Sequence, residues 1–119
     1  MPHIVLLVRK LPYRTSHIYE LTRIGQALAG VDLPTTVIFS EEGLFCLLQN
    51  QNPTALSMES ILINLQQLKK YGATFYVIQE SLTAQGLQPH QLMTNFDLQF
   101  ISRSTAAQLI HKAKFTLEV

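Results

Sequence analysis

Residues 3–8 read HIVLLV, and the five residues that follow His3 are all apolar. A strand with one face in solvent would alternate apolar and polar side chains, whereas this run is continuous. Continuous runs are typical of strands that are covered on both faces, as in a parallel sheet. Four further strands are expected later in the chain: Leu33–Phe39, Ala73–Ile78, Leu98–Ile101 and Phe115–Val119.

Helical patterns lie between these strands, and each begins near a Ser or Thr that can cap a helix. Strands that alternate with helices predict a single domain over residues 1–119. Its class is α/β, a three-layer α/β/α fold with a mainly parallel five-stranded sheet. The expected helices run from Thr15 or Ser16 to Leu28, from Ser40 to Leu48, from Ser57 to Lys70, from Ser81 to Gln85, and onward from a cap at Ser104 or Thr105.

The composition sets limits on the partners of this chain. Charged residues make up 14% of its 119 residues, against about 25% in a typical soluble domain. A small domain with so few charges is expected to bury part of its surface against another chain. A monomer with a neutral polar surface is the alternative. The net charge of +1 argues against direct nucleic-acid binding, which normally shows as a basic surface.

The sequence also bears on the compartment. It holds one cysteine, so an internal disulfide is impossible, which suits a reducing cytoplasm. The apolar run before Arg9 is too short for a signal sequence, and no segment approaches the ~20 apolar residues of a membrane span. We therefore expect a cytoplasmic protein without a membrane partner.

Polar side chains follow the first three predicted strands. In an open α/β sheet, ligands bind beyond the carboxyl ends of the strands, so these side chains are expected to share one edge. That edge is a candidate for a polar contact or a small-anion site. A solvated charged loop is the alternative, since exposed ion pairs contribute only ~0–1 kcal/mol. The candidate binding residues are Arg9, Lys10, Tyr13, Arg14, Ser40, Glu41, Glu42 and Gln79.

No cofactor or metal is expected. The sequence has neither GxGxxG nor GxxxxGK(S/T), the glycine-rich loops that bind nucleotide phosphates. Its four histidines, His3, His17, His90 and His111, are scattered singly and lack metal-ligand spacing with Cys46.

The single cysteine, Cys46, lies in the stretch FSEEGLFCLL, residues 39–48. If Ser40 caps this helix, Cys46 falls in the second turn, beyond the end where the helix dipole lowers a thiol pKa. Nearby carboxylates of Glu41 and Glu42 would raise that pKa, because they repel the thiolate. We therefore expect Cys46 to be structural, and a thiol-dependent activity is the alternative.

Four segments, taken in order, carry a resemblance to a known family. They are IVLLVRKLPYRTS, EEGLFCLLQNQNP, LKKYGATFYVIQESLTAQGL and FTLEV. Their order and spacing resemble the DsrE/DsrF-like sulfur-relay family, most closely its DsrF/TusC branch. The resemblance implies a subunit of the complexes that pass persulfide sulfur toward tRNA 2-thiouridine, or that operate in intracellular sulfur oxidation.

The resemblance also implies where a relay cysteine would lie. In the catalytic branch this cysteine ends the third strand, and the corresponding position here is Ile78 or Gln79. Neither residue can hold a persulfide, so the expected role is a non-catalytic subunit or assembly partner. Whether the chain is an enzyme on its own stays open. The alternatives are a sulfurtransferase that uses Cys46 and a homo-oligomeric binder of a small ligand.

Members of this family form closed trimers and hexamers, so the implied partners are this chain itself or paralogous DsrE-type subunits. The segment Leu44–Leu48 is apolar at every position, more than one sheet face is expected to cover. Ile63 lies away from the main apolar stripe of its helix. Contacts between subunits are therefore expected at Phe45, Cys46, Leu47, Leu48 and Ile63.

Overall fold

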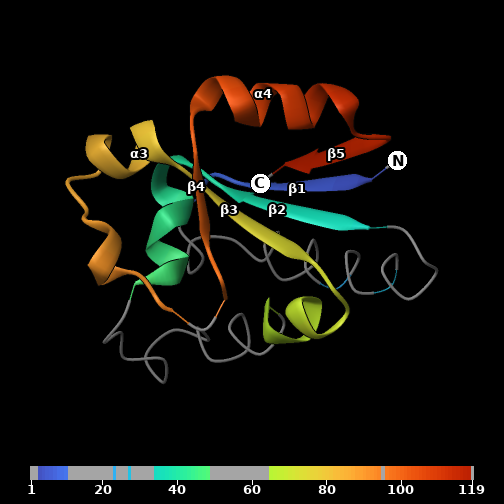
Figure 1. The fold of residues 1–119 in the computed structure, drawn as a ribbon, viewed down its shortest axis with the longest axis horizontal. Helices are drawn as coiled ribbons and strands as arrows, with labels where there is room; N and C mark the ends of the chain where they lie inside the picture. The colour runs from blue at the N-terminus through green and yellow to red at the C-terminus, as the bar shows by residue number, and fades with distance from the viewer. Residues whose placement is uncertain are drawn as a thin grey trace.

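The computed structural model describes residues 3–10, 23, 27, 34–48, 65–94 and 96–118. Five strands of this part of the chain form one sheet in the order β4-β3-β2-β1-β5 (Figure 1). All their pairings are parallel, which confirms the α/β class and makes this sheet wholly parallel. The strands are β1 (Ile4–Val8), β2 (Thr35–Phe39), β3 (Thr74–Ile78), β4 (Gln99–Ile101) and β5 (Phe115–Glu118).

The pleat of β1 explains its continuous apolar run. Ile4, Leu6 and Val8 face one side of the sheet, and Val5 and Leu7 face the other. Strands β2 and β3 repeat this alternation. Each face of the sheet therefore carries its own apolar core, as the sequence predicts for strands that are covered on both sides.

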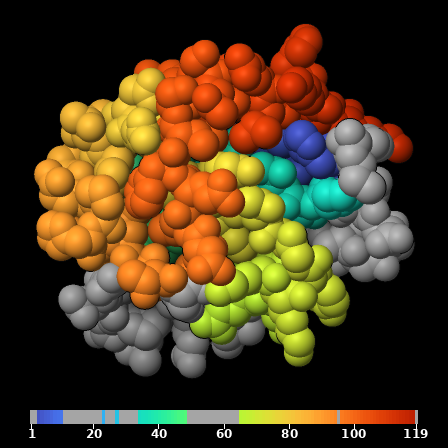
Figure 2. Space-filling view, viewed as in Figure 1, coloured from blue at the N-terminus to red at the C-terminus, as the bar shows by residue number. Residues whose placement is uncertain are grey.

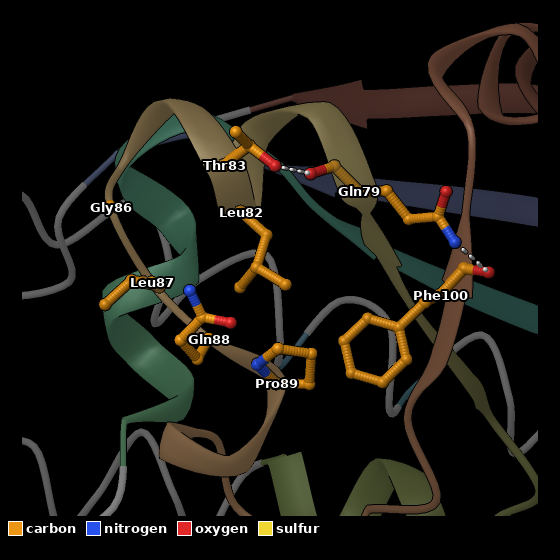
Figure 3. A pocket seen from close by; sticks show the side chains of 8 residues that line it. All are labelled: Gln79, Leu82, Thr83, Gly86, Leu87, Gln88, Pro89 and Phe100. Carbon is orange, nitrogen blue, oxygen red and sulfur yellow. Dashed lines mark hydrogen bonds between the residues drawn. The ribbon is translucent and has the colours of Figure 1, made fainter.

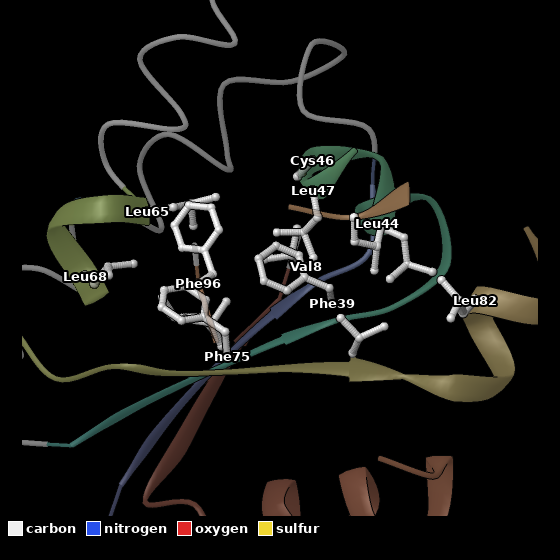
Figure 4. Packing of buried hydrophobic residues seen from close by; sticks show 14 of the residues in the cluster. Val8, Phe39, Leu44, Cys46, Leu47, Leu65, Leu68, Phe75, Leu82 and Phe96 are labelled. Atoms are coloured by element: carbon white, nitrogen blue, oxygen red, sulfur yellow. The ribbon is translucent and has the colours of Figure 1, made fainter. Parts of the chain in front are cut away.

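The larger core lies on the face covered by η2 (Glu41–Leu47) and by the helical residues 65–70 (Figure 1). Three phenylalanines fill much of it (Figure 4): the ring of Phe75 lies 6.3 Å from that of Phe39 and 5.3 Å from that of Phe96, centroid to centroid. Aromatic pairs at such separations add to the burial of apolar area. This face holds most of the buried apolar side chains of the described residues.

The smaller core lies beneath α4 (Arg103–Lys112), which covers the opposite face (Figure 1). Ala106 is buried there, and Leu109 and Ile110 pack beside it. With α4 on one side and η2 on the other, the sheet forms the middle of three layers. The predicted α/β/α architecture is therefore confirmed.

The helix after β3 begins earlier than predicted. It is α3 (Gln79–Ala84), and it follows the strand without a loop instead of beginning at Ser81. It ends before Gly86, whose φ of +70° favours glycine, as expected. The short η3 (Pro89–Gln91) follows.

Two predicted caps differ in the structure. Helix α4 is capped by Ser102, whose Oγ accepts a hydrogen bond from the Thr105 backbone N–H at 3.1 Å, so the expectation of a cap at Ser104 or Thr105 is wrong. Ser102 directly follows β4, and the chain turns there. Ser40 does precede η2, but its hydroxyl makes no capping bond. Its backbone N–H donates to the carbonyl of Val8 at 2.9 Å instead.

Two predicted helices are described only in part. Arg23 and Ala27 are helical, within the first of them. Residues 65–70 are the helical end of the second, and Gly72 follows with a φ of +93°. The remainder of both helices lies outside the described residues.

Candidate functional site

The carboxyl ends of the parallel strands meet at one edge of the sheet, here called the rim. A hollow of about 500 Å³ lies there. The structure brings together four of the candidate binding residues around it, and their role in binding stays a prediction. Tyr13 and Arg14 lie outside the described residues. The hollow is lined by Arg9, Lys10, Glu41, Glu42, Gln85 and Glu118.

Glu118 is a rim residue that the sequence reasoning missed. Its Oε1 accepts a hydrogen bond from Arg9 Nη1 at 2.6 Å, and both side chains are about half exposed. The pair joins the end of β1 to the end of β5, because these two strands are neighbours. The sequence predicts a last strand in a mainly parallel sheet, and a residue near the carboxyl end of such a strand is expected on the rim. That signal could have placed Glu118 there.

The strand order places this hollow at the position where other open α/β sheets bind ligands. Strands β2, β3 and β4 lie on one side of β1, and β5 lies on the other. The order therefore reverses between β1 and β5, which is the switch point where open α/β sheets hold their ligands. Here that point carries the ion pair between Arg9 and Glu118. With three carboxylates and two cations in its lining, the hollow suits a polar contact better than a small anion.

The segment that brings Glu41 and Glu42 to the rim depends on Gly43. A Cβ atom at Gly43 would lie 2.1 Å from the carbonyl oxygen of Val8, so only glycine permits η2 to approach the end of β1. Glu41 adopts a positive φ of 51°, which is uncommon outside glycine. Gly43 therefore allows the close approach that brings the two preceding glutamates to the rim.

A second hollow, of about 390 Å³, adjoins the position where the resemblance places a relay cysteine. Ile78 is buried at the end of β3, whereas Gln79 is exposed and lines the hollow. Gln79 Nε2 donates to the carbonyl of Phe100 at 3.4 Å, and Thr83 Oγ1 donates to the carbonyl of Gln79 at 3.4 Å (Figure 3). Gln79 thus helps to join the start of α3 to β4.

The next residue strengthens this junction. Glu80 Oε1 accepts a hydrogen bond from the backbone N–H of Arg103 at 2.9 Å. The Arg103 guanidinium in turn lies 3.7 Å from Glu41 Oε1. The rim ends of β3 and β4 are therefore tied together by neutral and charged side chains, and neither Ile78 nor Gln79 supplies a nucleophile.

Cys46 lies in the larger core, with 1% of its surface exposed (Figure 4). Burial raises the pKa of its thiol to about 12, and a backbone hydrogen bond partly opposes this rise. At neutral pH the group is a protonated thiol, and the thiolate is the form that attacks or carries sulfur. The geometry agrees with a structural role for Cys46.

The same burial corrects part of the expected subunit contact. Cys46 and Leu47 are enclosed by their own chain and have almost no surface to offer a partner. More of this apolar segment is buried within its own chain than its sequence suggests. Phe45 and Leu48 remain partly exposed, and Ile63 lies outside the described residues.

The part of the chain that the structure describes has neither a metal-binding cluster nor a membrane-spanning helix. No group of three or more His, Cys, Asp or Glu side chains there is placed to hold a metal ion. None of the helices in the described ranges has the length and apolar character needed to cross a membrane.

The sequence profile of the DsrE/DsrF-like family matches residues 3–117. The chain belongs to the DsrE/DsrF-like family. It is also 30% identical, over 90 residues, to the Protein TusC homolog of Pseudomonas aeruginosa, a match that covers 75% of this chain and 76% of that relative. The family assignment rests on these two matches.

Solved structures share the DsrE-like fold with this chain. The ychN protein from E. coli superposes with a TM-score of 0.78 at 16% identity, over 100% of both chains. The protein MTH1491 from Methanobacterium thermoautotrophicum gives 0.68 at 11% identity, over 98% of this chain and 99% of that one. At such low identity these matches show the fold alone.

Proposed function

We propose that this DsrE/DsrF-like chain is a non-catalytic subunit of a sulfur-relay complex, where it holds a cysteine-bearing paralogue in place. Membership of the family, and similarity to a TusC homolog, support a role related to sulfur relay. Such complexes pass persulfide sulfur toward tRNA 2-thiouridine or operate in intracellular sulfur oxidation. A single unpaired cysteine suits the reducing cytoplasm as its compartment.

One observation carries the non-catalytic part of the proposal: β3 ends in Ile78 and α3 begins with Gln79. A sulfur carrier needs an accessible thiolate. Ile78 has no heteroatom in its side chain, and the amide of Gln79 is not a nucleophile. The sulfurtransferase alternative would require Cys46, but its burial and raised thiol pKa argue against it.

Purification of the tagged chain from its native host would test the partner. The proposal expects a co-purifying subunit of the same fold, in fixed stoichiometry, with a cysteine at the end of its third strand. Identification and stoichiometry come from mass spectrometry of the intact complex. A chain that purifies alone as a 13.5 kDa monomer would contradict the proposal.

The rim hollow is proposed as a polar contact within this complex. Arg9 and Glu118 are half exposed there, so a partner can reach them without unfolding the chain. Replacing Arg9 and Arg14 with alanine should weaken partner binding while the free energy of unfolding changes little. If the double variant binds the partner with unchanged affinity, the rim is not part of the interface.

A further inference from the structure

The two edges of the sheet are protected differently. Edge strands expose unpaired backbone groups, and proteins commonly guard them with charged side chains. Edge strand β5 has such guards: Lys114 precedes it, and Glu118 at its end bonds to Arg9. Edge strand β4 consists of Gln99, Phe100 and Ile101 and has no charge. Of the two edges in the described sheet, that of β4 is thus the one left open to another strand.

Two hollows lie beside β4. Both are lined by Phe100 and Pro89. The first, of about 390 Å³, extends toward Gln79 and Leu82, and its surface opening is visible between β4 and residues 84–91 (Figure 2). The second, of about 220 Å³, extends toward Leu98. Leu98 and Phe100 are two residues apart, the spacing of side chains on one face of a strand.

The linings of these hollows are mainly apolar or uncharged. In the first, the side chains of Leu82, Pro89 and Phe100 converge (Figure 3). The second contains one charged residue, Asp97, and its Oδ2 lies 3.5 Å from Lys69 Nζ. A segment that covers both hollows is therefore matched if it is extended and uncharged, with apolar side chains at alternate positions.

We propose that the outer edge of β4 seats an extended, uncharged segment of the partner subunit, which adds to the sheet as a strand and places side chains in both hollows. This inference rests on the proposed function, since it assigns the surface by which the subunit holds its partner. Backbone hydrogen bonds along the edge supply affinity, and the two hollows select alternate side chains, as in other strand-addition complexes.

The test compares two phenylalanines on the two edge strands. Phe100 on β4 is 36% exposed and Phe115 on β5 is 38% exposed, so Phe115→Glu is a matched control for Phe100→Glu. Phe100→Glu should raise the dissociation constant of the purified complex by about tenfold or more, because a carboxylate is costly to bury without a partner. Phe115→Glu should leave it unchanged. Thermal unfolding of each variant shows that it is folded.

Gln99→Lys gives a second variant, because its side chain is already exposed and a lysine guards an edge strand. It should weaken the complex as Phe100→Glu does. Hydrogen exchange should also slow at residues 99–101 when the partner binds. Folded β4 variants with unchanged affinity, or no added protection at β4, would overturn the edge assignment while a stable wild-type complex upheld the proposed function. A wild-type chain that binds no subunit would overturn both.

Discussion

At the scale of single residues, the environment of one thiol decides whether this chain can carry sulfur. In the sequence, two glutamates and a glycine precede Cys46, and its position in the helix and these carboxylates predict a structural role. The fold places these residues apart: Glu41 and Glu42 line the rim hollow, whereas Cys46 is buried in the larger core. Desolvation therefore governs its thiol, and raises the pKa to about 12.

This raised pKa has a consequence at alkaline pH. The unfolded thiol loses its proton near its ordinary pKa of 9.0, but the folded one keeps it until about 12. Unfolding thus releases a proton within this window, and the free energy of unfolding should fall by about 1.4 kcal/mol per pH unit from this group. Below pH 9 its contribution is constant. Chemical denaturation of wild type and Cys46→Ala at pH 8 to 10.5 isolates the effect, and equal slopes would contradict it.

Gly43 makes a second prediction at this scale. Gly43→Ala should destabilise the fold by about 3 kcal/mol, the upper end of overpacking costs, because its Cβ would meet the Val8 carbonyl at 2.1 Å. Gly86→Ala is the control. That glycine has a φ of +70° but open space around it, so its cost should be about 1–2 kcal/mol, from backbone strain alone. Denaturant unfolding that ranks Gly86→Ala as the costlier change would refute this account of η2.

At the scale of the elements, the start of α4 is a sharp test. Ser102→Ala should reduce the free energy of unfolding by about 1 kcal/mol, because it removes the acceptor for the Thr105 N–H. Ser104→Ala, at an exposed position inside the helix, should change it by less than about 0.5 kcal/mol. Both values follow from urea denaturation. A larger loss of free energy of unfolding for Ser104→Ala would indicate that Ser104 caps the helix, as the sequence suggests.

Elements were more predictable than the contacts between them. Continuous apolar runs identify strands that are covered on both faces, so β1 and the parallel sheet could be predicted from sequence alone. The cap of α4 could not, because Ser102, Ser104 and Thr105 differ little as capping residues. The end of β4 decides which of them precedes the first helical turn.

The candidate site shows the same limit. The grouping of Arg9 with Glu41 and Glu42 follows from parallel strands, whose carboxyl ends share one edge. The bond from Arg9 to Glu118 depends on β5 lying beside β1. The contact of Gln79 with Phe100 depends on β4 lying beside β3. These contacts depend on the strand order, which no local pattern in the sequence encodes.

At the scale of the whole molecule, the low charge content and the uncharged β4 edge both favour a surface that binds another chain. In the proposed function, this subunit has no accessible thiol in its described residues and would contribute to sulfur relay through the surface that it offers a partner. The rim hollow and the β4 edge are the two such surfaces proposed for it. Gln79, at the junction of β3 with α3, lines the first hollow beside β4, and Gln85, at the end of α3, lines the rim hollow.

The central claim is that sulfur resides on the partner and not on this chain. Its most direct test is intact-mass measurement of the purified complex after incubation with a persulfide donor, under non-reducing conditions. The account predicts the gain of sulfur on the cysteine-bearing partner and an unchanged mass for this chain. A stable gain of one sulfur on this chain, abolished by Cys46→Ser, would contradict it.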